Sequence, residues 1–412
     1  MHRLTTPWGD LDLTRFPAEP REQLRAWDAA DEYLLRHLAE AGGPSGGTVV
    51  LGDRWGALTT ALAAAPTGDL SGEPTGDPTG DPTGGPAAPP TTAPAPYRLT
   101  QISDSFLGQQ ATRANLRRAA PGARVRLLST RDAPPERIDL LLVRVPKSLA
   151  LLEDQLRRLA PAVHPGTVVV GTGMTTEIHT STLRLFERIL GPTRTSLAVR
   201  KARLILCAPA DRTPDPGPNP WPLRYALPDG IGPLSGRTVT NHAGVFCADR
   251  LDIGTRFLLQ HLPVRTGRDR VVDLGCGNGV VGTAAAVANP DSDVLFVDES
   301  HQAVASAEAT FRANTGPAAK AEFLVADALA AVPPESADLV LNNPPFHSHR
   351  ATTETAARHM FASARAALRP GGELWVVANR HLPYHVRLRR LFGNCEVAAS
   401  DPKFVILRAV KR

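Results

Sequence analysis

Short apolar runs of strand length recur through the second half of the chain, and longer segments with helical spacing lie between them. The five runs are RVVDLG (270–275), DVLFVDE (293–299), AEFLVAD (321–327), ADLVLNN (337–343) and GELWVVAN (372–379). Strands that alternate with helices favour a parallel sheet that is covered on both faces. We therefore expect an α/β domain from about Gly236 onward.

The last two apolar runs, CEVAAS (395–400) and KFVILRAV (403–410), are separated only by Asp401 and Pro402. So short a connection joins antiparallel strands, because a parallel pair needs a long crossover. A parallel sheet that ends in an antiparallel hairpin resembles the seven-stranded, Rossmann-like layout of class I S-adenosyl-L-methionine-dependent methyltransferases. We expect that layout for the second half of the chain.

The first half of the chain repeats this order in a degraded form. The corresponding segments are VVLGDRWGAL with VVDLGCGNGVV, IDLLLVRVPKS (138–148) with ADLVLNNPPFH (337–347), and HPGTVVVG (164–171) with RPGGELWVV (369–377). The first copy is longer between these landmarks by about the length of one low-complexity segment. We infer two tandem class I domains with a degenerate N-terminal copy. Two unrelated α/β domains with similar strands are the alternative.

Two Pro-rich segments interrupt these patterns. Residues 66–95 form a Pro/Thr/Gly repeat with almost nothing apolar to bury, which predicts a disordered insertion. A second Pro-rich stretch begins at Ala208 and has the composition of a linker. We therefore divide the chain into a degenerate domain (1–207), a linker (208–235) and a catalytic domain (236–412).

Composition narrows the class of protein. The 412 residues exceed what one compact core usually holds, which agrees with two domains. No apolar run approaches the length of a membrane helix, and the N-terminus lacks the apolar core of a secretory signal, so we expect a cytoplasmic protein. The four cysteines are scattered without a CxxC pair, which argues against a disulfide framework and a structural zinc site.

The stretch DLGCGNG (273–279) follows a strand and precedes a helix. Glycine is needed where the backbone turns sharply against a ligand, because a Cβ atom would clash. Dinucleotide enzymes also use glycine turns, but their spacing is G-x-G-x-x-G. Asp298 ends the next strand, placed for ribose hydroxyls, and Asp327 ends the one after, placed for an adenine amino group. The pattern predicts a nucleoside cofactor; a tight turn flanked by surface acids is the alternative.

The stretch LNNPPFHSH (341–349) lies at the carboxyl end of the fourth strand, beside the crevice at the switch point of the sheet. Two prolines make the loop rigid and leave its carbonyl groups without competing N–H groups. The Asn343 amide oxygen and the Pro344 carbonyl can accept both hydrogens of a planar amino group, and Phe346 can stack on a flat ring. The loop therefore predicts in-line methyl transfer to such a group by positioning and electrostatics. A simple Pro-Pro turn is the alternative.

The N-P-P-F motif after the fourth strand is typical of amino-group methyltransferases, and the chain resembles the ribosomal RNA guanine-N2 methyltransferases. The stretches that carry this resemblance are NPPFH, GVFCADRLDIGTRFLL (244–259) and GGELWVVANRHLPYH (371–385). Residues 379–407 are most similar to the type that methylates 23S rRNA in the large subunit. The resemblance is strong over about 240–412 and looser before it. It implies S-adenosyl-L-methionine as cofactor and ribosomal RNA as partner.

The resemblance also implies roles for individual residues. Asn343, Pro344, Pro345 and Phe346 are expected to hold the target guanine. The stretch from Gly244 to Thr255 is expected to lie over the methionine end of the cofactor. The expected cofactor-binding residues are Phe246, Asp252, Thr255, Asp273, Gly275, Cys276, Gly277, Gly279, Asp298, Asp327 and Asn343.

The first copy departs from these motifs where the chemistry would occur. Arg54 stands at the position of Gly277, and Arg144 and Lys147 stand at those of Asn343 and Phe346. An arginine would crowd the cofactor turn, and neither basic side chain can accept a hydrogen bond from an amine. We expect the first domain to be non-catalytic, with a structural or RNA-binding role.

Three acid-free segments, 105–130, 188–207 and 374–395, concentrate arginines suited to phosphate contact, although solvated helix faces give the same pattern. The third begins next to the catalytic loop. The residues expected to contact RNA there are His347, Arg380, His381, Arg387, Arg389 and Arg390. The histidines lack metal-ligand spacing, so no metal is expected, and we expect a monomer.

Three other functions remain open on the sequence. The first is guanine-N2 methylation of 16S rRNA. The second is methylation of a protein glutamine or of adenine N6, which also uses N-P-P-aromatic loops, although the F-H ending and the Arg-rich tail argue against it. The third is a catalytically idle RNA-binding assembly factor, against which the intact second-copy motifs argue.

Overall fold

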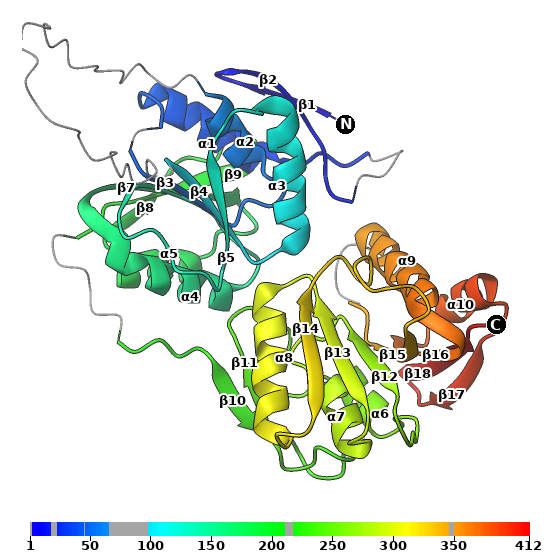
Figure 1. Ribbon diagram of the computed structural model, residues 1–412. Coiled ribbons are helices and arrows are strands. Elements are labelled where there is room, and N and C mark those ends of the chain that lie inside the picture. The colour runs from blue at the N-terminus through cyan, green and yellow to red at the C-terminus, as the bar shows by residue number, and fades with distance from the viewer. Residues whose placement is uncertain (1, 18–22, 45, 66–97, 211–216, 346–349) are drawn as a thin grey trace, which may run out of the picture.

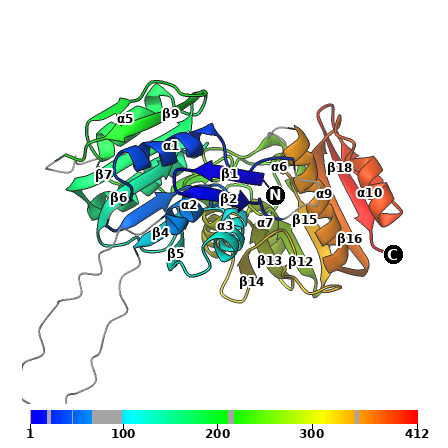
Figure 2. The same cartoon turned by 90° about the horizontal axis from the view of Figure 1, so that it is seen from above.

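The computed structural model describes residues 2–17, 23–44, 46–65, 98–210, 217–345 and 350–412. These residues form two α/β domains that lie next to each other (Figures 1 and 2). Each domain contains a seven-stranded sheet, and a short hairpin of β1 (His2–Thr6) and β2 (Gly9–Leu13) precedes the first. The expected insertion at 66–95 lies outside the described residues.

The sheet of the first domain has the strand order β5-β4-β3-β6-β7-β9-β8. Its strands are β3 (Thr48–Leu51), β4 (Leu99–Ser103), β5 (Val125–Ser129), β6 (Ile138–Arg144), β7 (Val163–Met174), β8 (Thr193–Thr195) and β9 (Ala202–Cys207). Its helices are α1 (Ala29–Glu40), α2 (Ala57–Ala64), α3 (Phe106–Ala119), α4 (Leu149–Leu159) and α5 (Thr180–Ile189), with a short 3-10 turn at Ala160–Ala162.

The sheet of the second domain has the equivalent order β14-β13-β12-β15-β16-β18-β17. Its strands are β12 (Arg270–Leu274), β13 (Asp293–Asp298), β14 (Lys320–Val325), β15 (Ala337–Asn342), β16 (Leu368–Asn379), β17 (Glu396–Ser400) and β18 (Phe404–Val410). Its helices are α6 (Ile253–Leu259), α7 (Val280–Ala288), α8 (His301–Asn314), α9 (Arg350–Ala367) and α10 (Tyr384–Phe392).

Both sheets have five parallel strands followed by an antiparallel pair. The tandem class I layout and its terminal hairpins are therefore confirmed. The duplication extends to single glycines. A Cβ atom on Gly279 would come within 2.6 Å of the Ala307 Cα in α8, and one on Gly56 would come equally close to the Thr112 Cα in α3.

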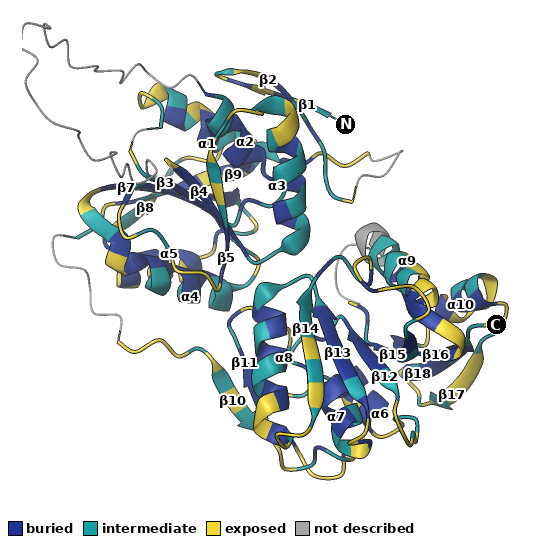
Figure 3. Ribbon diagram, in the orientation of Figure 1, coloured by how far each residue is buried: buried dark blue, intermediate teal, exposed yellow. Residues whose placement is uncertain are grey.

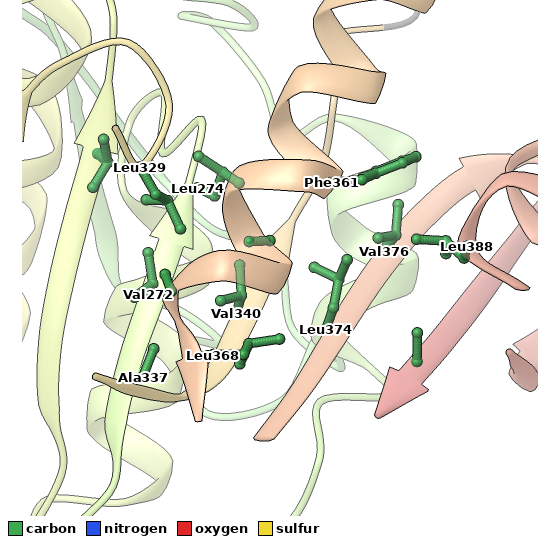
Figure 4. Packing of buried hydrophobic residues seen from close by; sticks show 14 of the residues in the cluster. Val272, Leu274, Leu329, Ala337, Val340, Phe361, Leu368, Leu374, Val376 and Leu388 are labelled. Atoms are coloured by element: carbon green, nitrogen blue, oxygen red, sulfur yellow. The ribbon is translucent and has the colours of Figure 1, made fainter. Parts of the chain in front are cut away.

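The central strands β12, β13 and β15 of the second sheet are mostly buried (Figure 3), and apolar side chains pack on both faces of this sheet. On one face Val272, Val340 and Leu374 pack beneath α9 and α10, with Phe361 of α9 among them (Figure 4). On the other face α6, α7 and α8 cover the sheet, with Phe311 as one of the contacts. The near-continuous apolar strands in the sequence reflect this burial on two sides.

The expected linker at 208–235 differs from the structure in its second half. Residues 223–226 form β10 (Leu223–Ala226), which pairs with β11 (Thr238–Asn241). The loop between them buries Leu227, Ile231 and Leu234 in one cluster with residues of α6 and α7. The prolines and glycines of this stretch suggested a linker, but three spaced apolar residues tie it to the second domain.

Equivalent turns of the two copies join the domains. The turn between β4 and α3 meets the turn between β13 and α8, so the backbone N–H of Phe106 donates to the Glu299 carbonyl (2.9 Å) and that of His301 donates to the Asp104 carbonyl (3.0 Å). Ser105 Oγ donates to the Glu299 carboxylate at 2.6 Å, and Ser300 Oγ donates to the Asp104 carboxylate at 2.6 Å. The contact is reciprocal, as in an isologous dimer interface.

Candidate active site

A glycine turn joins β12 to α7 at the centre of the second sheet. Gly275, Gly277 and Gly279 have φ values of +71°, +52° and +74°, which favour residues without a Cβ atom. The backbone N–H groups of Gly275 and Cys276 donate to the Val297 carbonyl, which fixes the turn against β13. A Cβ atom on Gly277 would meet no described atom within 4 Å. Gly279 serves the close approach of α8, whereas Gly277 leaves room for a ligand.

A cavity of about 900 Å³ lies over this turn. Gly279 is absent from its described lining, and Phe346 and His347 lie outside the described residues. The expected residues that the structure brings together around it are Phe246, Asp252, Thr255, Asp273, Gly275, Cys276, Gly277, Asp298, Asp327, Asn343, Pro344 and Pro345. The fold thus assembles, from five separate segments, most of the site that the motifs predicted.

Two acids lie beneath the cavity, the buried Asp273 and the partly buried Asp298. Burial raises the pKa of Asp273 to about 8, although its carboxylate accepts a hydrogen bond from the Gly282 N–H at 2.7 Å. Burial also raises the pKa of Asp298, whose oxygens accept from the N–H groups of Gly277 and Ser300 at 3.0 Å each. A cationic ligand would favour the ionised forms of both. S-adenosyl-L-methionine carries an ammonium and a sulfonium charge. It fits this largely apolar cavity, in which the carboxyl groups lie beneath the ligand site.

Helix α9 forms one wall of the cavity. The sequence motifs did not predict this wall. His359 Nε2 lies 2.9 Å from Oδ1 of Asp327, the acid expected to receive an adenine amino group. Met360 lies so close to the glycine turn that a Cβ atom on Gly275 would come within 2.9 Å of its Cε. Thr355 and Ala356 also line the cavity. These residues follow the catalytic loop without a motif of their own, so spacing alone could not reveal them.

The first domain also lines this cavity, again with residues that motif reasoning missed. Its lining residues are Arg15, Phe16, Pro17, Gln23, Leu24, Trp55, Leu107 and Lys147. The Arg15 guanidinium lies over the Trp55 ring, 5.3 Å from its centroid. The cavity is therefore shared between domains whose contributing residues lie far apart in the sequence.

The catalytic loop follows β15 directly. Asn343 Nδ2 donates hydrogen bonds to Thr255 Oγ1 (2.9 Å) and to Asp252 Oδ2 (3.3 Å), at the start of α6. Its Oδ1 is buried and has no hydrogen-bond partner among the described residues. An unsatisfied buried acceptor costs about 1–3 kcal/mol, so it marks a place where a ligand donor fits.

The arginines expected to contact RNA lie outside the described lining of the cavity. Arg380, His381, Arg389 and Arg390 are exposed. Arg387 instead forms an ion pair with Glu354 at 2.6 Å, which ties α10 to α9. No group of three or more His, Cys, Asp or Glu side chains able to hold a metal ion occurs in the described part of the chain. No helix in that part is long and apolar enough to cross a membrane.

Ion pairs fill the equivalent site of the first domain. Arg144 is fully buried and contacts Asp28, Asp31 (3.2 Å) and Glu177 (2.8 Å). Arg54 also contacts Asp28 and Glu177, in the place that Gly277 leaves open in the second domain. Burial raises the pKa of Asp31 to about 7, whereas the two arginines outweigh burial and hold the pKa of Glu177 at about 2.

The doubly wound sheet, the glycine turn with its acids and the N-P-P loop together define an S-adenosyl-L-methionine-dependent methyltransferase. Residues 236–408 match the family model "Methyltransferase small domain", and residues 1–71 and 91–211 match "RLMG N-terminal domain". The chain is 66% identical to ribosomal RNA large subunit methyltransferase G of Streptomyces avermitilis, over 99% of both chains. It is 43% identical to the protein of that name from Stutzerimonas stutzeri, over 99% of both chains.

The chain belongs to the ribosomal RNA large subunit methyltransferase G family. Among solved structures, it resembles a 16S rRNA N2 methyltransferase from T. thermophilus in complex with AdoMet and guanosine. The TM-score is 0.71 at 21% identity, and the match covers 100% of this chain and 98% of the other. That likeness confirms the fold over both domains.

Replacing Asp273 with asparagine is expected to weaken cofactor binding by at least about tenfold, because a cationic group loses its buried counter-charge. With a pKa of about 8 in the free protein, Asp273 must lose a proton to bind a cation. Wild-type affinity should therefore rise from pH 6 to pH 8, and the variant should lose this dependence. Isothermal calorimetry with S-adenosyl-L-methionine measures both effects.

The exposed Asp291 offers a matched control, and Asp291→Asn should bind the cofactor like the wild type. Equal affinities and equal pH profiles for the Asp273→Asn variant and the wild type would remove Asp273 from the cofactor site.

Proposed function

We propose that this protein transfers a methyl group from S-adenosyl-L-methionine to the exocyclic N2 amino group of a guanine in 23S ribosomal RNA, in the cytoplasm. The observation that carries the proposal is the Oδ1 of Asn343, which is buried beside the cavity and has no hydrogen-bond partner in the part of the chain that the structure describes. A planar amino group supplies the hydrogen-bond donor that this acceptor lacks.

The proposed chemistry rests on positioning. The Asn343 Oδ1 and the Pro344 carbonyl accept the two amino hydrogens, which turns the nitrogen lone pair toward the cavity. When bound, the cofactor supplies an electrophilic methyl group on positively charged sulfur. A carbon–nitrogen bond forms as the carbon–sulfur bond breaks, and the amino proton leaves to water. Orientation of this kind accounts for a large part of many enzymatic accelerations.

No separate general base is included in the proposal. Among the described residues, Asp252 is the acid in contact with Asn343, and its Oδ2 already accepts from the Thr255 N–H, the Thr255 hydroxyl and Asn343 Nδ2. A carboxylate so engaged is poorly suited to remove a proton. Its contacts serve geometry instead.

We infer that the first domain is non-catalytic. Arg54 and Arg144 occupy the places where a cofactor turn and an amine acceptor would be needed, and both are held by ion pairs. Its contribution to the active site is the wall that includes Trp55 and Lys147. The basic and aromatic character of this wall suits a nucleic-acid substrate that enters between the domains.

The relatives support the choice of RNA. The relatives from Streptomyces avermitilis and Stutzerimonas stutzeri, 66% and 43% identical, carry the name ribosomal RNA large subunit methyltransferase G, whereas the 16S enzyme of T. thermophilus is 21% identical. We therefore propose 23S rRNA as the substrate, with 16S rRNA as the second candidate.

Nucleoside mass spectrometry of ribosomal RNA tests the proposal. A strain that lacks the gene should lose one N2-methylguanosine from its 23S rRNA, and the purified protein with S-adenosyl-L-methionine should restore it in vitro. 16S rRNA from the same strain is the matched substrate control. A mark lost from 16S rRNA alone, or an unchanged nucleoside profile, would contradict the proposal.

A further inference from the structure

The amide of Asn343 belongs to a chain of hydrogen bonds that ends at a carboxylate. Its Nδ2 donates to Thr255 Oγ1 at 2.9 Å and to Asp252 Oδ2 at 3.3 Å. The Thr255 hydroxyl lies 3.2 Å from the same Asp252 oxygen, and the Thr255 backbone N–H donates to it at 2.8 Å. Asp252 thereby caps α6 and anchors the catalytic loop at once.

The chemistry of these groups fixes which way the amide faces. A carboxylate only accepts hydrogen bonds, so the single hydrogen of the Thr255 hydroxyl points to Asp252. The hydroxyl then offers lone pairs to Asn343, and that side of the amide must be Nδ2. The opposite orientation would bring Oδ1 against the oxygens of Thr255 and Asp252, acceptor against acceptor. Oδ1 is therefore turned away from α6, where it is buried without a described partner.

The first domain contains the same contact in another chemical form. Asp28 caps α1 as Asp252 caps α6, and the equivalent of Asn343 is Arg144, which contacts Asp28 and Asp31. The link between the end of the fourth strand and the first turn of this helix is thus common to both copies. Arginine has no acceptor to offer, so only the second copy combines the link with an oriented oxygen.

We propose that Asp252 and Thr255 are positioning residues that hold the Asn343 amide with Oδ1 toward the target amino group. This inference rests on the proposed function. It also changes the role expected for Asp252 and Thr255, because the family resemblance assigned both residues to cofactor binding. Loss of the acceptor chain would let the amide rotate and present Nδ2, which would repel an amino group.

Two near-isosteric variants test the inference in the full chain. Asp252→Asn puts a neutral amide in place of the carboxylate whose Oδ2 both caps α6 and accepts from Asn343, so that position offers Asn343 either a weaker acceptor or a donor. Thr255→Val removes the acceptor at 2.9 Å. Each should lower the single-turnover rate on 23S rRNA from the gene-deleted strain by about 10-fold to 100-fold. The dissociation constant of S-adenosyl-L-methionine, measured by calorimetry, should change by less than about threefold.

Two further variants separate positioning from a merely structural role. Thr255→Ser restores the hydroxyl and should recover the wild-type rate. Asp28→Asn changes the equivalent cap in the first domain and should lower thermal stability without lowering the rate of the folded enzyme.

The outcomes distinguish the two proposals. If the wild-type protein leaves guanine N2 unmethylated, the proposed function fails and this inference falls with it. If the wild type is active but both variants keep its rate, the inference alone is overturned. It is also overturned if the variants lose cofactor affinity while the rate at saturating cofactor stays unchanged, because Asp252 and Thr255 then serve the cofactor.

Discussion

Replacing Asn343 with alanine is expected to lower the methyl-transfer rate by about 10²–10³-fold, while cofactor affinity stays near that of the wild type. The reason is that Oδ1 of this residue is the proposed side-chain acceptor for the amino group, and loss of one preorganised polar contact to a reacting group costs about 10²–10³-fold. The glycine turn and the two acids expected to hold the cofactor do not depend on it. Single-turnover assays and calorimetry on the same preparation measure the two quantities.

Asn289→Ala is the matched control for the loss of an asparagine side chain. Asn289 is buried at the end of α7, where its Nδ2 donates to the Gly267 carbonyl at 3.0 Å. It is not part of the described lining of the cavity. This variant should lose stability but keep its rate. An Asn343→Ala enzyme with the full wild-type rate would show that the amine acceptor lies elsewhere.

The sheet order was predictable because it depends on short-range patterns. Buried parallel strands are continuous apolar runs, and the two-residue connection at Asp401 and Pro402 permits only an antiparallel pair. The glycine turn was predictable for the same reason, since Gly275, Gly277 and Gly279 adopt the positive φ values that their spacing suggested.

The walls of the site were not predictable from these patterns. His359 and Met360 face the cavity because α9 crosses the sheet there, and Trp55 lines it because equivalent turns of the two domains meet. Both depend on packing between segments far apart in the sequence. The folded part of the stretch 208–235 was missed for a related reason. Leu227, Ile231 and Leu234 look isolated in the sequence until β10 pairs with β11.

The roles of Asp252 and Thr255 were hidden for a different reason. Both lie in a stretch that the resemblance assigned to the cofactor, and both line the cavity. Only the direction of the hydrogen bonds to Asn343 shows that they also determine the orientation of an amide. The paired Asp28 and Asp31 could have given a signal, since they align with Asp252 and Thr255 when the two copies are compared.

Replacing Arg144 with methionine is expected to destabilise the first domain by about 3–5 kcal/mol, because the buried carboxylate of Asp31 and the partly buried carboxylate of Glu177 lose their main counter-charge. The melting temperature should fall by roughly 10 °C for a domain of this size. Differential scanning calorimetry measures the loss. A second change, Asp31→Asn, should restore part of it by removing one of the uncompensated charges.

The pH dependence of the Arg144→Met variant separates electrostatics from packing. In the wild type, the pKa of Glu177 is about 2 and lies below its unfolded value, so its stabilisation is present at neutral pH and is lost as the pH falls toward 2. Without Arg144, burial raises the pKa of these carboxyls, and their destabilisation grows as the pH rises. The difference between variant and wild type should therefore shrink from pH 7 to pH 5. A difference that is constant with pH would point to a cavity left by the side chain.

Arg144 and Asn343 occupy equivalent positions in the two copies. Loss of Arg144 should reduce the stability of the first domain, whereas loss of Asn343 should reduce catalysis. This difference is expected if the two copies took different functions after duplication.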